Sequence, residues 1–209
     1  MSASERSYGG KAMSERRAER RRRFLLAGLA VFGESGYQSS SITAVCESAG
    51  LARAQFYEHF ANREDLLVAV YEMIQDDAMR AVEIAARRAD GAVAAERHRA
   101  GVAAYAHSVG GDPRRAAIAF VQIVGLNERV ERHRAVVRAK WARFIRSEFE
   151  RMYGPGNPPA GGYDTAATAF IGALFALVHR WSADDPRPSL DSITDVLTRF
   201  LVALAPSDS

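Results

Sequence analysis

The chain has 209 residues, 48% of them hydrophobic and 25% charged, a composition that excludes a largely disordered protein and allows a buried core. Its single cysteine, Cys46, excludes an internal disulfide and a cysteine-based metal site. The net charge is only +3, yet residues 1–60 hold nine bases and six acids while the remainder holds nineteen of each. This asymmetry indicates either a polyanion-binding head on a neutral body or a solvated basic tail.

Targeting signals are not evident in the sequence. Residues 1–23 are polar and basic, with no apolar stretch of the kind found in a signal peptide. The longest apolar run, 166–178, is shorter than the ~18–20 residues that a membrane span requires. We therefore expect a cytoplasmic protein with no membrane association and a buried helix at 166–178.

The N-terminal third of the chain predicts a disordered tail over residues 1–15 and then three helices. Apolar residues at helical spacing between Arg16 and Phe32 indicate the first helix, which we expect to end near Gly36. The second follows serine caps at 39–41 and buries positions 42, 45, 46 and 49 before Gly50. The third covers about 52–59, with Phe56 and Phe60 one turn apart on its inner side.

Six further helices are predicted beyond Asn62, which resembles an N-cap. Their expected ranges are about 63–89, 93–109, 114–125, 128–153, 163–181 and 189–205, with loops at 154–162 and 184–188. The sequence shows no strand pattern. It therefore predicts an all-α protein of about nine helices. We expect a DNA-binding domain over 16–65 with a helix-turn-helix, and a helical ligand-binding and dimerisation domain over 66–209.

The predicted third helix has the two faces that a DNA-reading helix needs. Phe56 and Phe60 face inward, and polar side chains occupy the remaining surface. Arginine and glutamine at 53 and 55 suit the edges of guanine and adenine, while tyrosine and histidine at 57 and 59 suit phosphates. Hydroxyls at the start of the second helix, on Ser40, Ser41 and Thr43, suit a phosphate as well.

At these residues the chain resembles the TetR (tetracycline-repressor) family of bacterial regulators. The resemblance covers about residues 20–72. It is carried by FLLAGLAVF at 24–32, GY at 36–37, SSITAVCESAGL at 40–51, FYEHF at 56–60 and NREDLL at 62–67. Ala52 and Ala54 depart from the pattern, in which a serine-like cap and a glycine or proline are usual. At Ala52 the departure predicts that one backbone donor at the start of the third helix loses its partner.

The resemblance implies a DNA-contacting set and a homodimer. The implied DNA-contacting positions are Ser40, Ser41, Thr43, Arg53, Gln55, Tyr57, His59 and Arg63, and we include Phe56 of the same motif in the site. The dimer would form through the last two helices, about 163–181 and 189–205. Their apolar stripes contain Phe170, Leu174, Leu177 and Trp181, and Ile193, Val196, Leu197, Phe200 and Leu204. The same stripes would also suit the core of a single chain.

The basic run from Arg16 to Arg23 has two interpretations. Residues 11–23 carry a net charge of +5, which suits an arm that grips DNA phosphates or the minor groove. The same residues equally suit the solvated beginning of a helix. Cys46, in contrast, lies on the apolar stripe of the second helix, and we interpret it as a small buried hydrophobic residue.

The C-terminal domain offers candidates for a ligand cavity between helices. The polar and aromatic candidates are Tyr105, His107, Phe120, Gln122, Asn127, Trp141, Phe144, Phe170, Phe175 and His179, although any one of them suits an ordinary core. The five histidines lack metal-binding spacing, and no phosphate-binding loop follows a strand. We therefore expect no cofactor, no metal and no enzymatic activity.

These patterns together predict a ligand-responsive repressor. A dimer would bind a palindromic double-stranded DNA operator, and a small apolar effector in the C-terminal domain would favour a conformation that releases it. Two other hypotheses are a small-molecule-binding or enzymatic helical bundle without specific DNA binding, and a non-specific architectural DNA binder. The sequence identifies neither the effector nor the operator.

Overall fold

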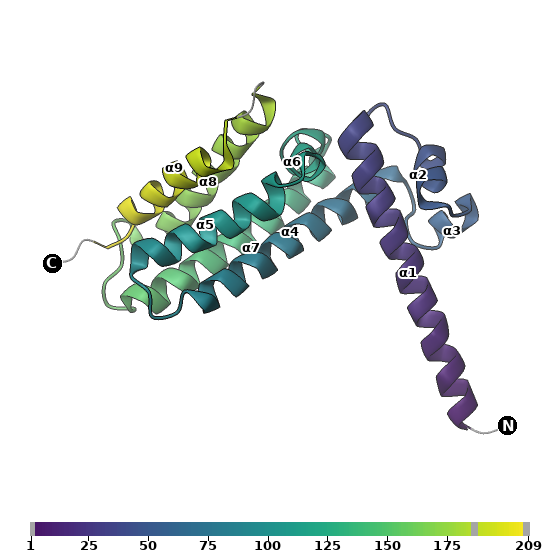
Figure 1. Ribbon diagram of the computed structural model, residues 1–209, viewed down its shortest axis with the longest axis horizontal. Helices are drawn as coiled ribbons and strands as arrows, with labels where there is room; N and C mark the ends of the chain where they lie inside the picture. The colour runs from purple at the N-terminus through teal and green to yellow at the C-terminus, as the bar shows by residue number, and fades with distance from the viewer. Residues whose placement is uncertain (1–2, 185–187, 207–209) are drawn as a thin grey trace. The chain divides into compact units, whose positions relative to one another are not determined.

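The computed structural model describes residues 3–184 and 188–206, with only the backbone considered for residues 3–12 and 183. Within these ranges the fold is all-helical, as predicted (Figure 1). The chain divides into two compact units, the first ending at Met73 and the second beginning at Ile74. The predicted boundary at residue 65 is therefore eight residues short of the structural one.

The first unit contains α1 (Ala3–Ser35), α2 (Ile42–Ala49), α3 (Arg53–Tyr57) and the beginning of α4 (Arg63–Arg88). The tail predicted to be disordered over residues 1–15 is helical from Ala3 onward, and residues 1–2 lie outside the described part. No proline interrupts residues 1–35, so every N–H after the first turn of α1 is able to bond to a carbonyl one turn back. Gly9 and Gly10 weaken such a helix by only ~1 kcal/mol each.

The core of the first unit is aromatic and aliphatic. Its most deeply buried side chains are Phe24, Phe32, Phe56, Leu66, Leu67, Val70 and Tyr71. Gly28 allows α1 to approach α4 closely, because a Cβ at this position would lie 3.0 Å from a methyl carbon of Val70. The first turns of α4 therefore belong to this core, which explains why the unit extends past residue 65.

The second unit contains the rest of α4 and the helices from α5 onward. Their bounds are α5 (Ala94–Gly110), α6 (Pro113–Ala117), the π-helical η1 (Ile118–Gln122), α7 (Glu128–Tyr153), α8 (Gly162–Ala183) and α9 (Leu190–Ala203). Helix α5 packs on α9, and α8 packs on α7 and α9 (Figure 1). Among the described helices, none has the length and apolar character needed to cross a membrane.

The predicted end signals agree with the observed helix ends. Asn62 accepts a hydrogen bond of 2.9 Å from the Asp65 N–H, and Asn127 accepts one of 3.0 Å from the Val130 N–H. Pro113 occupies the first turn of α6. The π-helical segment η1 was not predicted, because its apolar spacing is indistinguishable from that of a short α-helix. The predicted loop at 184–188 lies partly outside the described residues.

Candidate functional site

The first short helix of the DNA-binding candidate, α2, is capped at both ends. The Ser41 hydroxyl accepts a hydrogen bond of 3.1 Å from the Ala44 N–H and begins the helix. Gly50 ends it with a left-handed φ of 60°, a conformation that favours glycine. Arg23 of α1 donates to the carbonyl oxygens of Ala49 and Gly50, where a cation also suits the negative end of the helix dipole.

Helix α3 is seated by one fully buried aromatic ring. Phe56 is 0% exposed, and its ring centroid lies 5.5 Å from that of Phe24 on α1 in an edge-to-face arrangement. The Phe60 ring completes this cluster, with its centroid 5.5 Å from that of Phe56 and 6.4 Å from that of Phe24. The inclusion of Phe56 among the DNA-contacting residues was therefore wrong, because the ring anchors the helix from within the core.

The opposite side of α3 is open to solvent. Arg53 and Tyr57 are exposed one turn apart, and the Arg53 guanidinium donates to the Tyr57 hydroxyl at 3.2 Å. The hydrogen bond to Tyr57 raises the already high pKa of Arg53, so its charge is permanent. Thr43 on α2 is exposed too, and Ser41 beside it keeps an exposed side chain despite its capping role. Four of the predicted positions thus remain accessible.

Gln55 has a second role that the sequence did not indicate. Its side-chain Oε1 accepts a hydrogen bond of 2.9 Å from the backbone N–H of Ala52. The backbone N–H of Gln55 donates to the Ala52 carbonyl at 3.0 Å. The expectation that a backbone donor loses its partner at Ala52 was wrong, because the glutamine side chain and a tight turn replace the missing cap. The half-buried Gln55 amide nitrogen remains for an outside contact.

Ser40, Arg63 and His59 face the protein more than the solvent. Ser40 is 8% exposed and donates to the Tyr37 carbonyl at 2.6 Å. The Arg63 guanidinium lies 4.3 Å over the Tyr37 ring and donates to the Ser40 carbonyl. Burial, with help from the nearby charge of Arg17, lowers the pKa of His59, which therefore is neutral at neutral pH.

The basic run on α1 is largely committed to internal contacts. Arg17 donates to the Glu58 carbonyl at 3.1 Å, Arg20 forms an ion pair of 3.4 Å with the Glu58 carboxylate, and Arg21 lies 5.4 Å over the Phe60 ring. These arginines hold α3 and the turn after it against α1. Arg22 is mostly exposed and has only a 4.0 Å pair with Glu19, so it is better placed than Arg17 or Arg20 to meet a polyanion.

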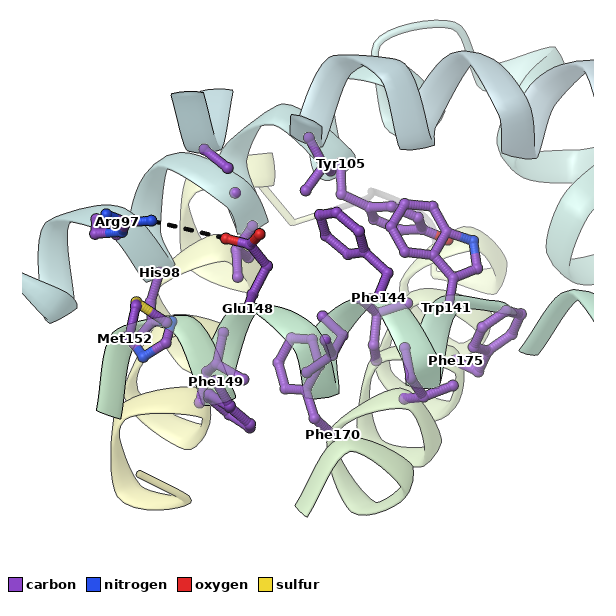
Figure 2. Close-up of a pocket in the computed structure, with 18 residues that line it drawn as sticks. Arg97, His98, Tyr105, Trp141, Phe144, Glu148, Phe149, Met152, Phe170 and Phe175 are labelled. Carbon is purple, nitrogen blue, oxygen red and sulfur yellow. Dashed lines mark ion pairs between the residues drawn. The ribbon is translucent and has the colours of Figure 1, made fainter. Parts of the chain in front are cut away.

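The second unit encloses a pocket of about 60 Å³ between α4, α5, α7, α8 and α9 (Figure 2). Its walls are formed by Val82, Ala86, Arg97, His98, Gly101, Val102, Tyr105, Trp141, Phe144, Ile145, Glu148, Phe149, Met152, Phe170, Ile171, Leu174, Phe175 and Leu201. Most of these side chains are aliphatic or aromatic. The pocket therefore suits an apolar molecule, although it is small beside the ~300–1,000 Å³ of typical ligand sites.

Five of the predicted ligand residues meet in this pocket: Tyr105, Trp141, Phe144, Phe170 and Phe175. The other predicted residues lie elsewhere. Phe120 is buried and contacts the Phe175 ring from outside the pocket wall, while His179 bonds to the Phe120 carbonyl. Asn127 caps α7, and the exposed His107 bonds to the Ala103 carbonyl of its own helix. Gln122 is half-buried in η1 and does not line the pocket.

Sequence reasoning missed the polar residues of the pocket, Arg97, His98 and Glu148. His98 is 5% exposed, and its Nε2 lies 2.9 Å from the Tyr153 hydroxyl. Burial, together with the neighbouring Arg97, lowers the pKa of His98 to about 4, so the ring is neutral. Arg97 and His98 lie in a charged stretch of α5 that has the sequence of a solvated helix face. Among the described residues no group of three metal-ligating side chains occurs.

The predicted dimer stripes on α8 and α9 are mostly internal. Phe170, Leu174, Trp181 and Leu197 are at most 5% exposed within the single chain. Their assignment to a dimer interface is therefore wrong, because they close the subunit's own core. The outward faces instead carry Thr168, Gly172 and Ala176 on α8, and Val196 and Val202 on α9, the two valines being 52% and 41% exposed.

A capped support helix, a tight turn at Gly50 and a short exposed helix seated on α1 define the helix-turn-helix class of proteins. Residues 24–70 match the family model described as "Bacterial regulatory proteins, tetR family". The first unit therefore carries a segment of the TetR-family type. The cysteine and apolar positions of α2 and the aromatic anchors of α3 all lie within the matched segment.

Individual relatives extend this likeness. The regulator UidR of Escherichia coli K12 is 34% identical over 59 residues, which cover 28% of this chain and 30% of UidR. The match thus spans less than a third of that relative. Among solved structures, FadR of Bacillus subtilis in complex with stearoyl-CoA has a TM-score of 0.74 at 19% identity, covering 87% of this chain and 97% of FadR. AibR, in complex with isovaleryl coenzyme A and operator DNA, has a TM-score of 0.64 at 20% identity over 90% and 100%. These structures share the fold.

Proposed function

We propose that the protein is a transcriptional repressor that binds a palindromic DNA operator as a homodimer and releases it when an apolar effector occupies the pocket of the second unit. The observation that carries the proposal is the rigid presentation of Arg53 and Tyr57. Both are exposed on α3, while Phe56 between them is fully buried. A helix fixed in this way offers a constant set of donors to the major groove.

The DNA contacts divide by their chemistry. Arg53 and the amide nitrogen of Gln55 are the base-reading candidates, since guanidinium and carboxamide groups match base edges. Ser41, Thr43 and Tyr57 present hydroxyls suited to phosphates. Ser40, His59 and Arg63, which make internal contacts, support the surface from behind. In AibR a protein of the same fold is bound to operator DNA, which favours the same use of this unit here.

The effector proposal follows from the pocket. Its walls are largely apolar, and FadR and AibR are bound to stearoyl-CoA and isovaleryl coenzyme A respectively. We infer that the effector carries a hydrocarbon portion that enters between α5, α7 and α8. Because the pocket volume is only about 60 Å³, an effector larger than the pocket must displace wall side chains. The effector then binds better to a conformation in which these side chains have moved. This difference in affinity shifts the protein toward that conformation.

The homodimer proposal rests on the outward faces of α8 and α9. Gly172 has open space above it, so that another helix is able to approach α8 closely. Val196 and Val202 expose apolar area on α9, which packs against α8. Two copies of this pair of helices would form a four-helix interface.

A direct test measures mass and DNA binding together. We expect sedimentation to give twice the chain mass of 22.8 kDa. We also expect fluorescence anisotropy to show binding to duplex DNA that weakens steeply with salt as phosphate contacts displace counterions. A protein that remains at 22.8 kDa and leaves the anisotropy of labelled duplex unchanged at low salt would contradict the proposal.

A further inference from the structure

The pocket has chemically different ends. Figure 2 shows Arg97, His98, Glu148 and Met152 gathered at one end, and Trp141 and Phe175 at the other. The wall residues of α7 run from Trp141 to Met152, which are eleven positions apart and so are separated by ~16 Å along the helix axis at ~1.5 Å per residue. The pocket is therefore elongated, with its charges confined to one end.

Arg97 has hydrogen-bonding capacity that the protein leaves unused. Its Nη1 donates to the Asp90 carboxylate at 2.7 Å. Its Nη2 lies 3.8 Å from the Glu148 carboxylate, too far for a hydrogen bond. Nε and Nη2 are both buried and have no hydrogen-bond acceptor. A guanidinium has five donors in a fixed fork, and buried donors without acceptors are unfavourable, so an incoming oxygen acceptor is stabilised here.

The carboxylates at this end of the pocket already have partners. Glu148 is held by Arg151, one turn further along α7, as well as facing Arg97. Asp90, which also pairs with both arginines, is 68% exposed, so solvent screens its charge. The Arg97 side chain is only 11% exposed. Arg151, which pairs with Glu148, is 45% exposed and does not line the pocket, so Arg97 is the sheltered cation of the pocket wall.

From this geometry we infer that the effector is a single-chain amphiphile whose anionic head binds Arg97 and whose hydrocarbon tail extends along α7 toward Trp141 and Phe175. This inference rests on the proposed effector site. The head is a carboxylate or the phosphate-bearing group of an acyl thioester, since both present anionic oxygens. The half-buried Phe144 and Phe175 are the wall rings that move to admit the tail.

The test is calorimetric titration of the full chain, without DNA, with four probes of equal tail length: dodecanoate, dodecanoyl-CoA, dodecanol and dodecyltrimethylammonium. We expect at least one anionic probe to bind about tenfold tighter than dodecanol, the size of effect that a hydrogen bond to a charged group supplies. Dodecyltrimethylammonium should bind no better than dodecanol. The tighter of the two anionic probes identifies the head group.

Variants assign the preference to Arg97. Arg97→Gln should abolish the excess affinity of the anionic probe and leave dodecanol binding unchanged. Arg97→Lys keeps the charge but loses the forked donors of the guanidinium, so it should retain part of the excess affinity for the anionic probe. It replaces Arg97→Gln in the test if that variant does not fold. Arg99→Gln is the matched control, because Arg99 lies on the same helix but is outside the pocket and pairs with Asp195. It should bind all four probes as the wild type does.

Equal binding of the anionic and neutral probes, or an anionic preference that survives in Arg97→Gln, would overturn the inference. Tighter binding of dodecyltrimethylammonium would overturn it too. Because these titrations contain no DNA, such results would leave the DNA-binding proposal intact. Conversely, an Arg97-dependent preference in a protein that binds no DNA would support the ligand and contradict the repressor.

Discussion

The indole Nε1 of Trp141 donates a hydrogen bond of 2.9 Å to Oε1 of Gln75, and both residues are buried. Trp141 lines the pocket from α7, whereas Gln75 lies on α4 two residues after the first unit ends. Two neighbouring contacts tie the same part of α4: Lys140 pairs with Asp76 at 2.8 Å, and Arg115 pairs with Asp77 at 3.0 Å. A pocket side chain is thus bonded to the helix that continues into the helix-turn-helix unit.

Replacing Trp141 with phenylalanine tests this connection. The variant keeps an aromatic ring but leaves the buried Gln75 oxygen without its donor, so we expect the free energy of unfolding to fall by about 1–3 kcal/mol. If this hydrogen bond also couples ligand binding to the DNA-binding unit, the ligand should still bind the pocket of the variant but should release DNA from it less effectively. Urea denaturation and anisotropy with and without ligand measure the two effects. Unchanged stability and unchanged release would show that the bond contributes neither.

The exposed face of α3 predicts a division between affinity and stability. Arg53→Met should lower DNA affinity at least fivefold by removing a groove contact, and it should leave the melting temperature unchanged, because Arg53 is exposed and its contacts to Tyr57 lie on the surface. Arg23→Met is the matched control. It removes the bonds to the Ala49 and Gly50 carbonyls, so it should lower the melting temperature of the protein. Equal loss of affinity in both variants at a temperature where both are folded would contradict the assignment.

His98 predicts a loss of stability in acid. Its pKa in the folded protein is about 4, against an ordinary 6.5, because burial disfavours the charged ring. The unfolded chain therefore binds the proton first as pH falls, and stability decreases from pH 6.5 down to about pH 4 by ~3 kcal/mol. His98→Gln should flatten the unfolding free energy over this range. Chemical denaturation at several pH values measures it, and an equally steep decline in the variant would exclude His98 as the cause.

The dimer prediction compares two exposed valines. Val196 on α9 is 52% exposed and belongs to the proposed interface, whereas Val136 on α7 is 64% exposed and does not. Val196→Glu should shift the sedimenting mass toward that of one chain, because it places a charge in an apolar contact. Val136→Glu should leave the dimer unchanged. A dimer that withstands Val196→Glu but dissociates with Val136→Glu would place the interface on another face.

Sequence patterns predicted the helices well because each carries its own signals. Asn62 and Asn127 mark helix beginnings, Gly50 marks an end, and the spacing of Phe56 and Phe60 identifies the inner face of α3. These signals act within one or two turns, so they are readable from neighbouring residues alone.

The roles of several charged residues were not predictable in this way. Arg97 appears in sequence as an ordinary surface cation and Arg63 as a DNA contact, and only the packing of distant residues turns Arg97 toward a pocket and Arg63 over an aromatic ring. The assignment of the apolar stripes on α8 and α9 to a dimer interface was wrong for a related reason. A buried core and an apolar interface place the same residue types at the same spacing, so Phe170 and Leu174 carry no sequence signal that separates the two.

The most direct test of the account is selection of bound duplexes from a random DNA pool by the purified protein. Two α3 helices related by a dimer axis should enrich a palindrome with half-sites one helical turn apart, ~34–36 Å between centres. Arg53→Met should reduce enrichment at specific base pairs of each half-site rather than uniformly. Enrichment of no sequence, or of an asymmetric single site that Arg53→Met leaves unchanged, would contradict DNA recognition by a dimer through α3.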